Sequence, residues 1–210
     1  ATFLREDLGE IDAESSSHLD AIDRLVRRTY SLIEGMLTMS RLGQLPIEYE
    51  PVALDEVVHE VTQDLRDRIR EREAIIEVGA LPVVHTWAFG LRTVLANLIT
   101  NALKYNEEQP HIHIEHRETT SVPSRPSSVG DDHVVIAVTD NGIGIEPHAF
   151  RSIFRMFHRL HRGERFPEGT GAGLAIIQRV IERLDGQVWL DSTPKLGSTF
   201  YISIPSGVRE

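Results

Sequence analysis

The feature that most constrains the fold is a strand-like run that leads directly into a turn containing an aspartate and two glycines. Residues 134–138 read Val-Val-Ile-Ala-Val, and this dense β-branched run predicts a buried central strand. Asp140, Gly142 and Gly144 follow it. Glycine lets the backbone approach a ligand closely, and a carboxylate at a strand end can accept a hydrogen bond from an exocyclic amine such as that of adenine. Taken alone, the segment is also compatible with a tight strand-to-helix turn, although the ligand-binding interpretation is favoured.

Apolar side chains three and four positions apart, the spacing of one helix face, predict helices elsewhere in the chain. These segments are residues 19–40, 54–72, 87–105 and 171–184. Pro147, which suits a first turn, predicts one more helix over residues 147–157. Further strands are expected at residues 75–78, 112–114, 187–190 and 199–204. Because strands and helices are mixed rather than strictly alternating, we expect an α+β sandwich with helices on one face of a sheet.

The segment between the two strands at residues 112–114 and 134–138 has a different character. Residues 119–132 are rich in Ser, Pro and Gly, so we expect a mobile loop there.

The first helix needs a partner. Asp12 and the serines at 15–17 mark its start, and Gly43, with Pro46 just beyond, marks its end. One helix cannot bury its own apolar face, and residues 1–8 are candidates for the last turns of an antiparallel neighbour. Such a hairpin is too small to form a core alone, so a dimeric helical bundle would complete it.

Composition excludes several classes of partner and site. The formal net charge of −10 disfavours nucleic acid and anionic membranes, both of which need a basic surface. The absence of cysteine excludes disulfides and thiolate metal sites. No run approaches the roughly 20 apolar residues of a membrane span, and no signal peptide is recognised, so we expect a cytoplasmic domain. Because the chain begins at Ala1 without Met, we expect a fragment of a longer protein.

The helix at residues 87–105 carries three polar side chains on one face. Asn97 and Asn101 are four positions apart and Lys104 follows three positions later. Amide oxygens suit Mg²⁺, and a lysine suits phosphate. A helix that merely has polar ends would show the same pattern, so this segment alone leaves both interpretations open.

A glycine-rich stretch opens the last helix. Gly169, Gly171 and Gly173 precede an amphipathic segment, where free backbone N–H groups and the helix dipole would face an anion. A dinucleotide fingerprint would need a strand just before these glycines, and a P-loop would need Gly-Lys-Ser/Thr after them. Neither condition is met. A second glycine turn, Gly197-Ser-Thr-Phe200, is by itself an ordinary hairpin turn.

In this order, the segments resemble the N, G1, G2 and G3 boxes of the histidine-kinase catalytic domain, a member of the ATPase superfamily that includes gyrase, Hsp90 and MutL. Ile153-Phe154-Arg-Met-Phe157 resembles the F box. The resemblance covers about residues 52–205 and is greatest to the phytochrome-like branch. It implies the two-layer Bergerat (GHKL) α/β sandwich with a mixed sheet over residues 46–210. Residues 1–45 resemble part of the dimerisation hairpin, mainly its second helix.

The resemblance also implies roles for individual residues. Asn101 would hold Mg²⁺ that bridges the ATP phosphates, with Asn97 assisting, Lys104 would contact phosphate, and Asp140 would read the adenine amine. Arg159 and Arg162 lie in the lid segment, where they either reach the γ-phosphate or stay solvated. The remaining expected pocket residues are Tyr105, Gly142, Gly144, Ile145, Gly169, Thr170, Gly171, Gly173, Leu174 and Thr199.

One residue separates kinases from hydrolases in this superfamily. Hydrolysing relatives carry a water-activating Glu four positions before the Mg²⁺-binding Asn, and this position is Asn97 here. An amide is no general base at neutral pH, so the chain is expected to present the γ-phosphate to another nucleophile.

That nucleophile is expected to be a histidine upstream of this fragment. The family pattern is His, an acidic residue, an apolar residue and a nearby Pro, and none of the ten histidines fits it. His59 lacks the Pro and His18 is followed by Leu19-Asp20, in the wrong order.

The expected function is that of a sensor histidine kinase module that uses ATP and Mg²⁺ and passes phosphate through the histidine to a response-regulator receiver domain. Expected partners also include a second copy, bound through the first helix, and upstream sensor domains of the bilin photoreceptor kind. The alternatives are a GHKL-type ATP-driven conformational switch, or a degenerate module that binds nucleotide or dimerises without catalysis.

Overall fold

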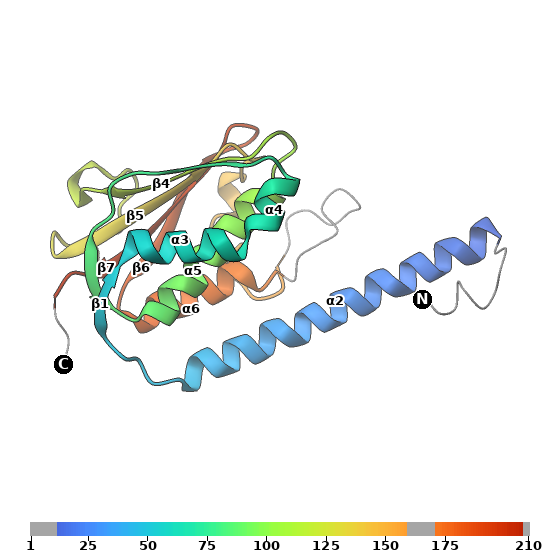
Figure 1. The fold of residues 1–210 in the computed structure, drawn as a ribbon, viewed down its shortest axis with the longest axis horizontal. Helices are drawn as coiled ribbons and strands as arrows, with labels where there is room; N and C mark the ends of the chain where they lie inside the picture. The colour runs from blue at the N-terminus through green and yellow to red at the C-terminus, as the bar shows by residue number, and fades with distance from the viewer. Residues whose placement is uncertain (1–11, 159–170, 208–210) are drawn as a thin grey trace.

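The computed structural model describes residues 12–158 and 171–207 (Figure 1). A long helix, α2 (Ala13–Gln44), leads to an α/β sandwich. Its helices are α3 (Leu54–Asp64), α4 (Arg66–Glu71), α5 (Ala88–Lys104) and α6 (Gly173–Arg183), with 3₁₀ turns at Thr119–Ser121 and Pro147–Ala149. Its strands are β1 (Glu50–Ala53), β2 (Ile75–Val78), β3 (Val83–Thr86), β4 (His111–Arg117), β5 (His133–Asp140), β6 (Gln187–Thr193) and β7 (Gly197–Pro205).

The main sheet is mixed, as expected. Its strand order is β2-β4-β5-β7-β6, and β1 and β3 form a separate antiparallel pair. Strand β2 runs parallel to β4, while the other neighbours are antiparallel. The β-branched run therefore does form the central strand, β5. Helices α3, α5 and α6 lie on one face of this sheet (Figure 1), which confirms the predicted sandwich.

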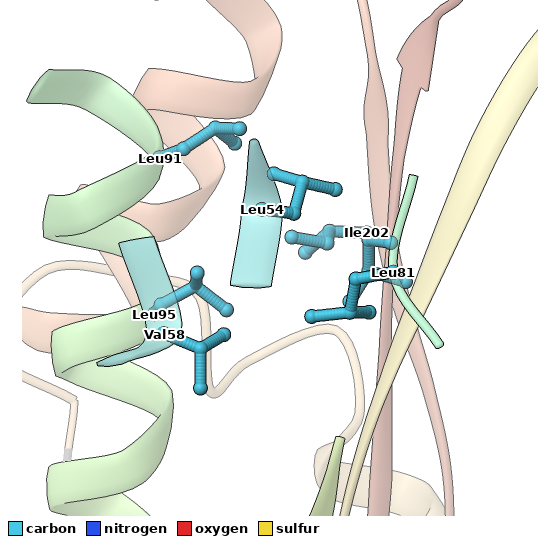
Figure 2. A pocket seen from close by; sticks show the side chains of 7 residues that line it. Leu54, Val58, Leu81, Leu91, Leu95 and Ile202 are labelled. Atoms are coloured by element: carbon cyan, nitrogen blue, oxygen red, sulfur yellow. The ribbon is translucent and has the colours of Figure 1, made fainter. Parts of the chain in front are cut away.

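The core lies between these helices and the sheet. Fully buried side chains of α5 and α6, such as Ile99 and Ile177, meet inward-facing strand residues such as Ile114 and Ile202. A cavity of about 10 Å³ remains, lined by apolar side chains from α3, α5 and the sheet, among them Leu54, Leu95 and Ile202 (Figure 2). A void of this size holds at most about one water and offers it no polar partner, so we treat it as a packing defect.

The loop at residues 119–132 differs from the mobile segment that we expected. Val122 and Val129 are buried with Trp189 and Tyr201 in a second, smaller cluster that also contains Val135 and Ala137. The indole Nε1 of Trp189 donates to the carbonyl oxygen of Pro123 at 3.3 Å. Two valines within a polar, proline-rich stretch are thus enough to hold the loop against the β5–β7–β6 region.

Two helix predictions need correction. Residues 54–72 form two helices, because the chain breaks at Leu65 between α3 and α4. Residues 147–157 form a single 3₁₀ turn, Pro147–Ala149, followed by further turns. Phe157 adopts φ +63° and donates its backbone N–H to Gly171 O at 2.9 Å. This bond places Phe157 beside Gly171, two residues before the start of α6. Strand β3 was not predicted.

Helix α2 follows its predicted boundaries closely. Asp12 caps its start by accepting a hydrogen bond from Ser15 N at 2.6 Å, and the helix ends at Gln44, one residue past Gly43. Its last turns belong to the core, because Leu42 is only 1% exposed. The Arg183 side chain donates to the carbonyl oxygens of Leu42 and Leu45 and so holds the end of α2 against α6.

Much of the rest of α2 exposes apolar side chains, including Ile22, Leu25, Val26, Tyr30, Ile33 and Met36. The proposed hairpin partner, residues 1–8, lies outside the described residues. Within residues 12–158 and 171–207, no helix combines the length and the apolar character that a membrane crossing requires.

Candidate nucleotide-binding site

The polar face of α5 meets the glycine that opens α6. The amide Nδ2 of Asn97 donates to Thr93 O at 2.8 Å, which assigns the donor side of this amide and leaves Oδ1 as the acceptor. A Cβ built on Gly173 would lie 2.8 Å from Asn97 Oδ1 and 3.9 Å from Asn101 Nδ2. The structure therefore brings two segments that are about 70 residues apart in the sequence into contact. The absence of a side chain at 173 leaves space in front of both amides.

Asp140 lies at the end of β5 and is largely buried. Its Oδ1 accepts a hydrogen bond from Gly142 N at 2.8 Å, and the backbone of Ser198 also bonds to the carboxyl group. Burial raises the pKa of Asp140 from 3.8 to about 6, because desolvation of the charged form outweighs these two stabilising backbone bonds. A ligand that donates a hydrogen bond to this carboxylate would stabilise its ionised form and so offset part of the cost of desolvation.

The turn after Asp140 is fitted tightly against its neighbours. A Cβ on Gly142 would lie 2.5 Å from Tyr105 O, and Ile143 N donates to the same oxygen at 3.0 Å. Gly144 has φ +69°, a conformation that other residues adopt only with strain, and its Cα faces the backbone of Thr193. The two glycines thus let the turn pack between the end of α5 and the turn joining β6 to β7.

The remaining predicted residues divide into two groups. Gly169, Thr170, Arg159 and Arg162 lie outside the described residues. For the others the structure gives local contacts. Lys104 Nζ donates to Tyr105 OH at 3.0 Å, and Ile145 N donates to Ser192 Oγ at 2.8 Å. Leu174 packs against the core, Thr199 Oγ1 lies 3.0 Å from Thr139 Oγ1, and Gly171 has φ +71°.

The sequence analysis missed two residues that shape this site, Asn106 and Asn141. The Nδ2 of Asn106 donates to Asn141 Oδ1 at 2.6 Å, and Asn106 is only 3% exposed. Each asparagine directly follows a predicted ligand group, Tyr105 in one case and Asp140 in the other. The position of each asparagine, one at a helix end and one in a turn, indicated that its side chain could bond to backbone groups. Nothing in the local sequence indicated that the two side chains would bond to each other.

The donor set suits a nucleotide together with a divalent cation. The end of β5 offers a buried acceptor, and the face of α5 offers amide oxygens and a lysine. The start of α6 adds a helix N-terminus beside a glycine, a setting that favours phosphate.

Comparison with known proteins identifies the family. The family described as histidine kinase-, DNA gyrase B-, and HSP90-like ATPase matches residues 88–208. Cyanobacterial phytochrome B from a Nostoc species is 37% identical over 207 residues, covering 97% of this chain and 26% of that protein. Phytochrome-like protein Cph1 from a Synechocystis species is 37% identical over 198 residues, covering 94% and 25%. The chain therefore spans about a quarter of the length of these relatives.

Solved structures show the same fold. Full-length ShkA in complex with AMPPNP superposes with a TM-score of 0.68 at 24% identity, covering 97% of this chain and 41% of that chain. The histidine kinase ThkA in complex with the response regulator protein TrrA superposes with a TM-score of 0.67 at 20% identity, covering 98% and 55%. Together with the family match over α5 to β7, these similarities show that the chain belongs to the ATP-binding family of histidine kinase-, DNA gyrase B-, and HSP90-like ATPases.

Proposed function

We propose that this chain is the catalytic module of a sensor histidine kinase, which transfers the γ-phosphate of ATP to a histidine elsewhere in the full-length protein. The observation that carries the proposal is the meeting of Asn97, Asn101 and Gly173, with an amide where hydrolysing relatives carry a glutamate. The phytochrome-like relatives, which match across nearly the whole chain, support the same assignment.

In this proposal the two ends of the site bind the two ends of ATP. Asp140 accepts the hydrogen bond of the adenine amine, and Gly142 and Gly144 shape the floor beside it. Asn101 and Lys104 bind the phosphate end, and the N-terminus of α6 adds the partial positive charge of its backbone N–H groups. Tyr105, Ile145, Leu174 and Thr199 line the margins, and Arg159, Arg162 and residues 169–171 complete the phosphate side.

Magnesium fits the same donor set. Asn101 would hold it, with Asn97 assisting through its free acceptor oxygen, and the ion would neutralise charge on the phosphates. Asn97 cannot withdraw a proton from water, because an amide is a very weak base at both its nitrogen and its oxygen. The site would thus hold ATP without hydrolysing it rapidly, which is what transfer to another nucleophile requires.

The partners follow from the same proposal. The exposed apolar face of α2 is long enough to bury against a second copy, so residues 1–45 are proposed to form part of a dimerisation hairpin and residues 46–210 the catalytic domain. The receiver domain of a response regulator is the proposed acceptor after the histidine, since ThkA was solved with such a partner. Upstream sensor domains of the phytochrome kind are proposed from the relatives.

Calorimetric titration with Mg-ATP tests the binding step. The chain is expected to bind Mg-ATP, and Asn101→Ala is expected to weaken binding by at least about tenfold, as loss of a metal-bridged phosphate contact implies. Thr100→Ala on the same helix serves as a matched control and should bind normally. Equal binding by Asn101→Ala would contradict the assignment of the phosphate end.

A longer chain that includes the upstream histidine tests the transfer step. It should incorporate label from γ-labelled ATP, and it should lose this activity with Asn101→Ala. If the present chain instead shows steady-state ATP hydrolysis, the ATP-driven conformational switch becomes the better assignment. If the longer chain binds ATP but takes up no label, a degenerate nucleotide-binding module is the better assignment.

A further inference from the structure

Two asparagines join the two halves of the proposed ATP site. The Nδ2 of Asn106 donates to Asn141 Oδ1 at 2.6 Å, although the residues are 35 positions apart. Asn106 follows Tyr105, the C-terminal cap of α5, and Asn141 follows Asp140, the last residue of β5. The bond therefore connects the helix that carries Asn101 and Lys104 to the strand that carries Asp140.

Backbone groups fix the orientation of both amides. Asn106 Oδ1 accepts from Glu108 N at 2.9 Å, so Nδ2 is the atom turned towards Asn141. Asn141 Oδ1 also accepts from His111 N at 2.8 Å, and Asn141 Nδ2 donates to Gln109 O at 3.0 Å. Each side-chain amide thus presents its donor and its acceptor to different partners, so neither can be flipped without losing hydrogen bonds.

The surrounding chain ties the same pair into the fold. Arg72 Nη2 donates to Asn106 O at 2.7 Å, which anchors the segment after α5 to the end of α4. Ile143 N donates to Tyr105 O at 3.0 Å, a second direct link between the turn after β5 and the end of α5. Asn106 is 3% exposed while Asn141 is exposed, so water can compete for this bond only from the Asn141 side.

We propose that Asn106 and Asn141 are positioning residues that set the distance between the phosphate-binding face of α5 and the adenine-binding carboxylate of Asp140. This inference rests on the proposed function, because it concerns a ligand that spans both ends of the site. Neither asparagine needs to touch the nucleotide. Their effect is to hold the two contact regions at the spacing that one ATP molecule requires.

The physical consequence is specific to ligands that bridge both regions. ATP gains affinity from engaging adenine and phosphate contacts together, which requires that the two regions hold a fixed separation. A ligand that uses one region alone does not depend on this separation. Loosening the link should therefore weaken ATP while adenosine and Mg-tripolyphosphate, which each occupy one region, bind as before.

The experiment compares these three ligands on four proteins: the wild type, Asn141→Ala, Asn106→Ala and the double variant. Asn141 is exposed and Asn106 is buried, so Asn141→Ala is expected to destabilise the fold less than Asn106→Ala. Thermal unfolding identifies any variant that does not fold. Gln109→Ala is the matched control, because it removes the side-chain bond from Nε2 to Glu73 O but keeps the backbone carbonyl oxygen that accepts from Asn141 Nδ2.

We expect Asn141→Ala to weaken ATP binding by about tenfold, which corresponds to the upper range for the net contribution of one hydrogen bond. Adenosine and Mg-tripolyphosphate should change by less than about twofold, Gln109→Ala should bind ATP normally, and the double variant should lose little more than either single variant. The last result would indicate that the two side chains act as one unit.

Unchanged ATP affinity in a folded Asn141→Ala would overturn the inference while leaving the proposed function standing. Equal weakening of all three ligands would also overturn it, because it would indicate general damage to the site rather than a loss of spacing. A wild-type chain that binds none of the three ligands would instead remove the proposed function, and the inference with it.

Discussion

The buried carboxylate of Asp140 makes the stability of this domain depend on pH in an unusual direction. Most structural carboxylates favour folding when ionised, but here burial raises the pKa from 3.8 to about 6. The folded protein therefore binds this proton more tightly than the unfolded chain does. In consequence, the contribution of Asp140 to stability is most favourable below about pH 4, declines as the pH rises through about 6 and is constant above that.

The magnitude follows from the pKa change. The difference between 3.8 and about 6 corresponds to about 3 kcal/mol at 25 °C. About 2 kcal/mol of this change falls between pH 4.5 and pH 7.5, a range that is convenient for measurement. Asp140→Asn removes the titration but keeps a side-chain oxygen that can accept the hydrogen bond from Gly142 N.

The assay is urea unfolding of nucleotide-free wild type and Asp140→Asn at several pH values. Taking the difference between the two proteins cancels all other titrating groups. The free energy of unfolding of the wild type, relative to the variant, should fall by about 2 kcal/mol from pH 4.5 to pH 7.5.

A nucleotide should reverse this trend. An adenine amine that donates to the ionised carboxylate stabilises it, so Mg-ATP binding should release protons near pH 6 in the wild type and none in Asp140→Asn. Calorimetry in buffers of different ionisation enthalpy measures the release. A stability difference that stays flat from pH 4.5 to pH 7.5 would refute the reasoning about burial, whatever the nucleotide does.

Three further predictions concern other parts of the molecule. Leu95→Ala enlarges the cavity in Figure 2 and should lower the free energy of unfolding by about 3 kcal/mol in urea titration, whereas a cost below about 1 kcal/mol would mean that the core collapses around the site. Asn97→Glu places a carboxylate four positions before Asn101 and should raise steady-state ATP hydrolysis by at least about tenfold in a coupled assay, with Asn97→Gln as the inactive control. Gly35→Val should displace α2 from α6, because a Cβ at 35 would lie 2.8 Å from Ala172 Cβ. Backbone amides in the last turns of α2 should then exchange hydrogen faster, and an unchanged exchange rate would contradict the contact.

Local sequence patterns predicted most of the elements. The β-branched run at 134–138 became the central strand β5, and the alternation around Ile112 and Ile114 became β4, with both isoleucines buried. Apolar spacing located α5 and α6 to within about two residues, and the capping residues Asp12 and Gly43 located the ends of α2. These predictions succeeded because each depends on side chains within one or two turns of each other, which the sequence displays directly.

The failures have a common cause in long-range contacts. Residues 147–157 were expected to form a helix, but Phe157 has φ +63° and its N–H bonds to Gly171 O, 14 positions further along the chain. The polar loop at 119–132 is held because Val122 and Val129 meet Trp189 and Tyr201, which lie 60 or more residues away along the chain. No local pattern contains the partner in either case.

The candidate site divides in the same way. The chemical identity and order of Asn101, Asp140 and the glycines were readable from the sequence, as was the amide at 97 in place of a general base. The sequence alone thus determined the family and the kind of ligand that its residues suit. Side-chain chemistry and spacing along the chain are local properties, and they do not depend on what packs against them.

Only the tertiary structure decided how these groups work together. The contact of Gly173 with Asn97, the raised pKa of Asp140 and the bond between Asn106 and Asn141 all depend on neighbours that are distant in the sequence. Desolvation and hydrogen-bond pairing are properties of the packed environment. They appear only when α5, β5 and α6 are assembled around the same space.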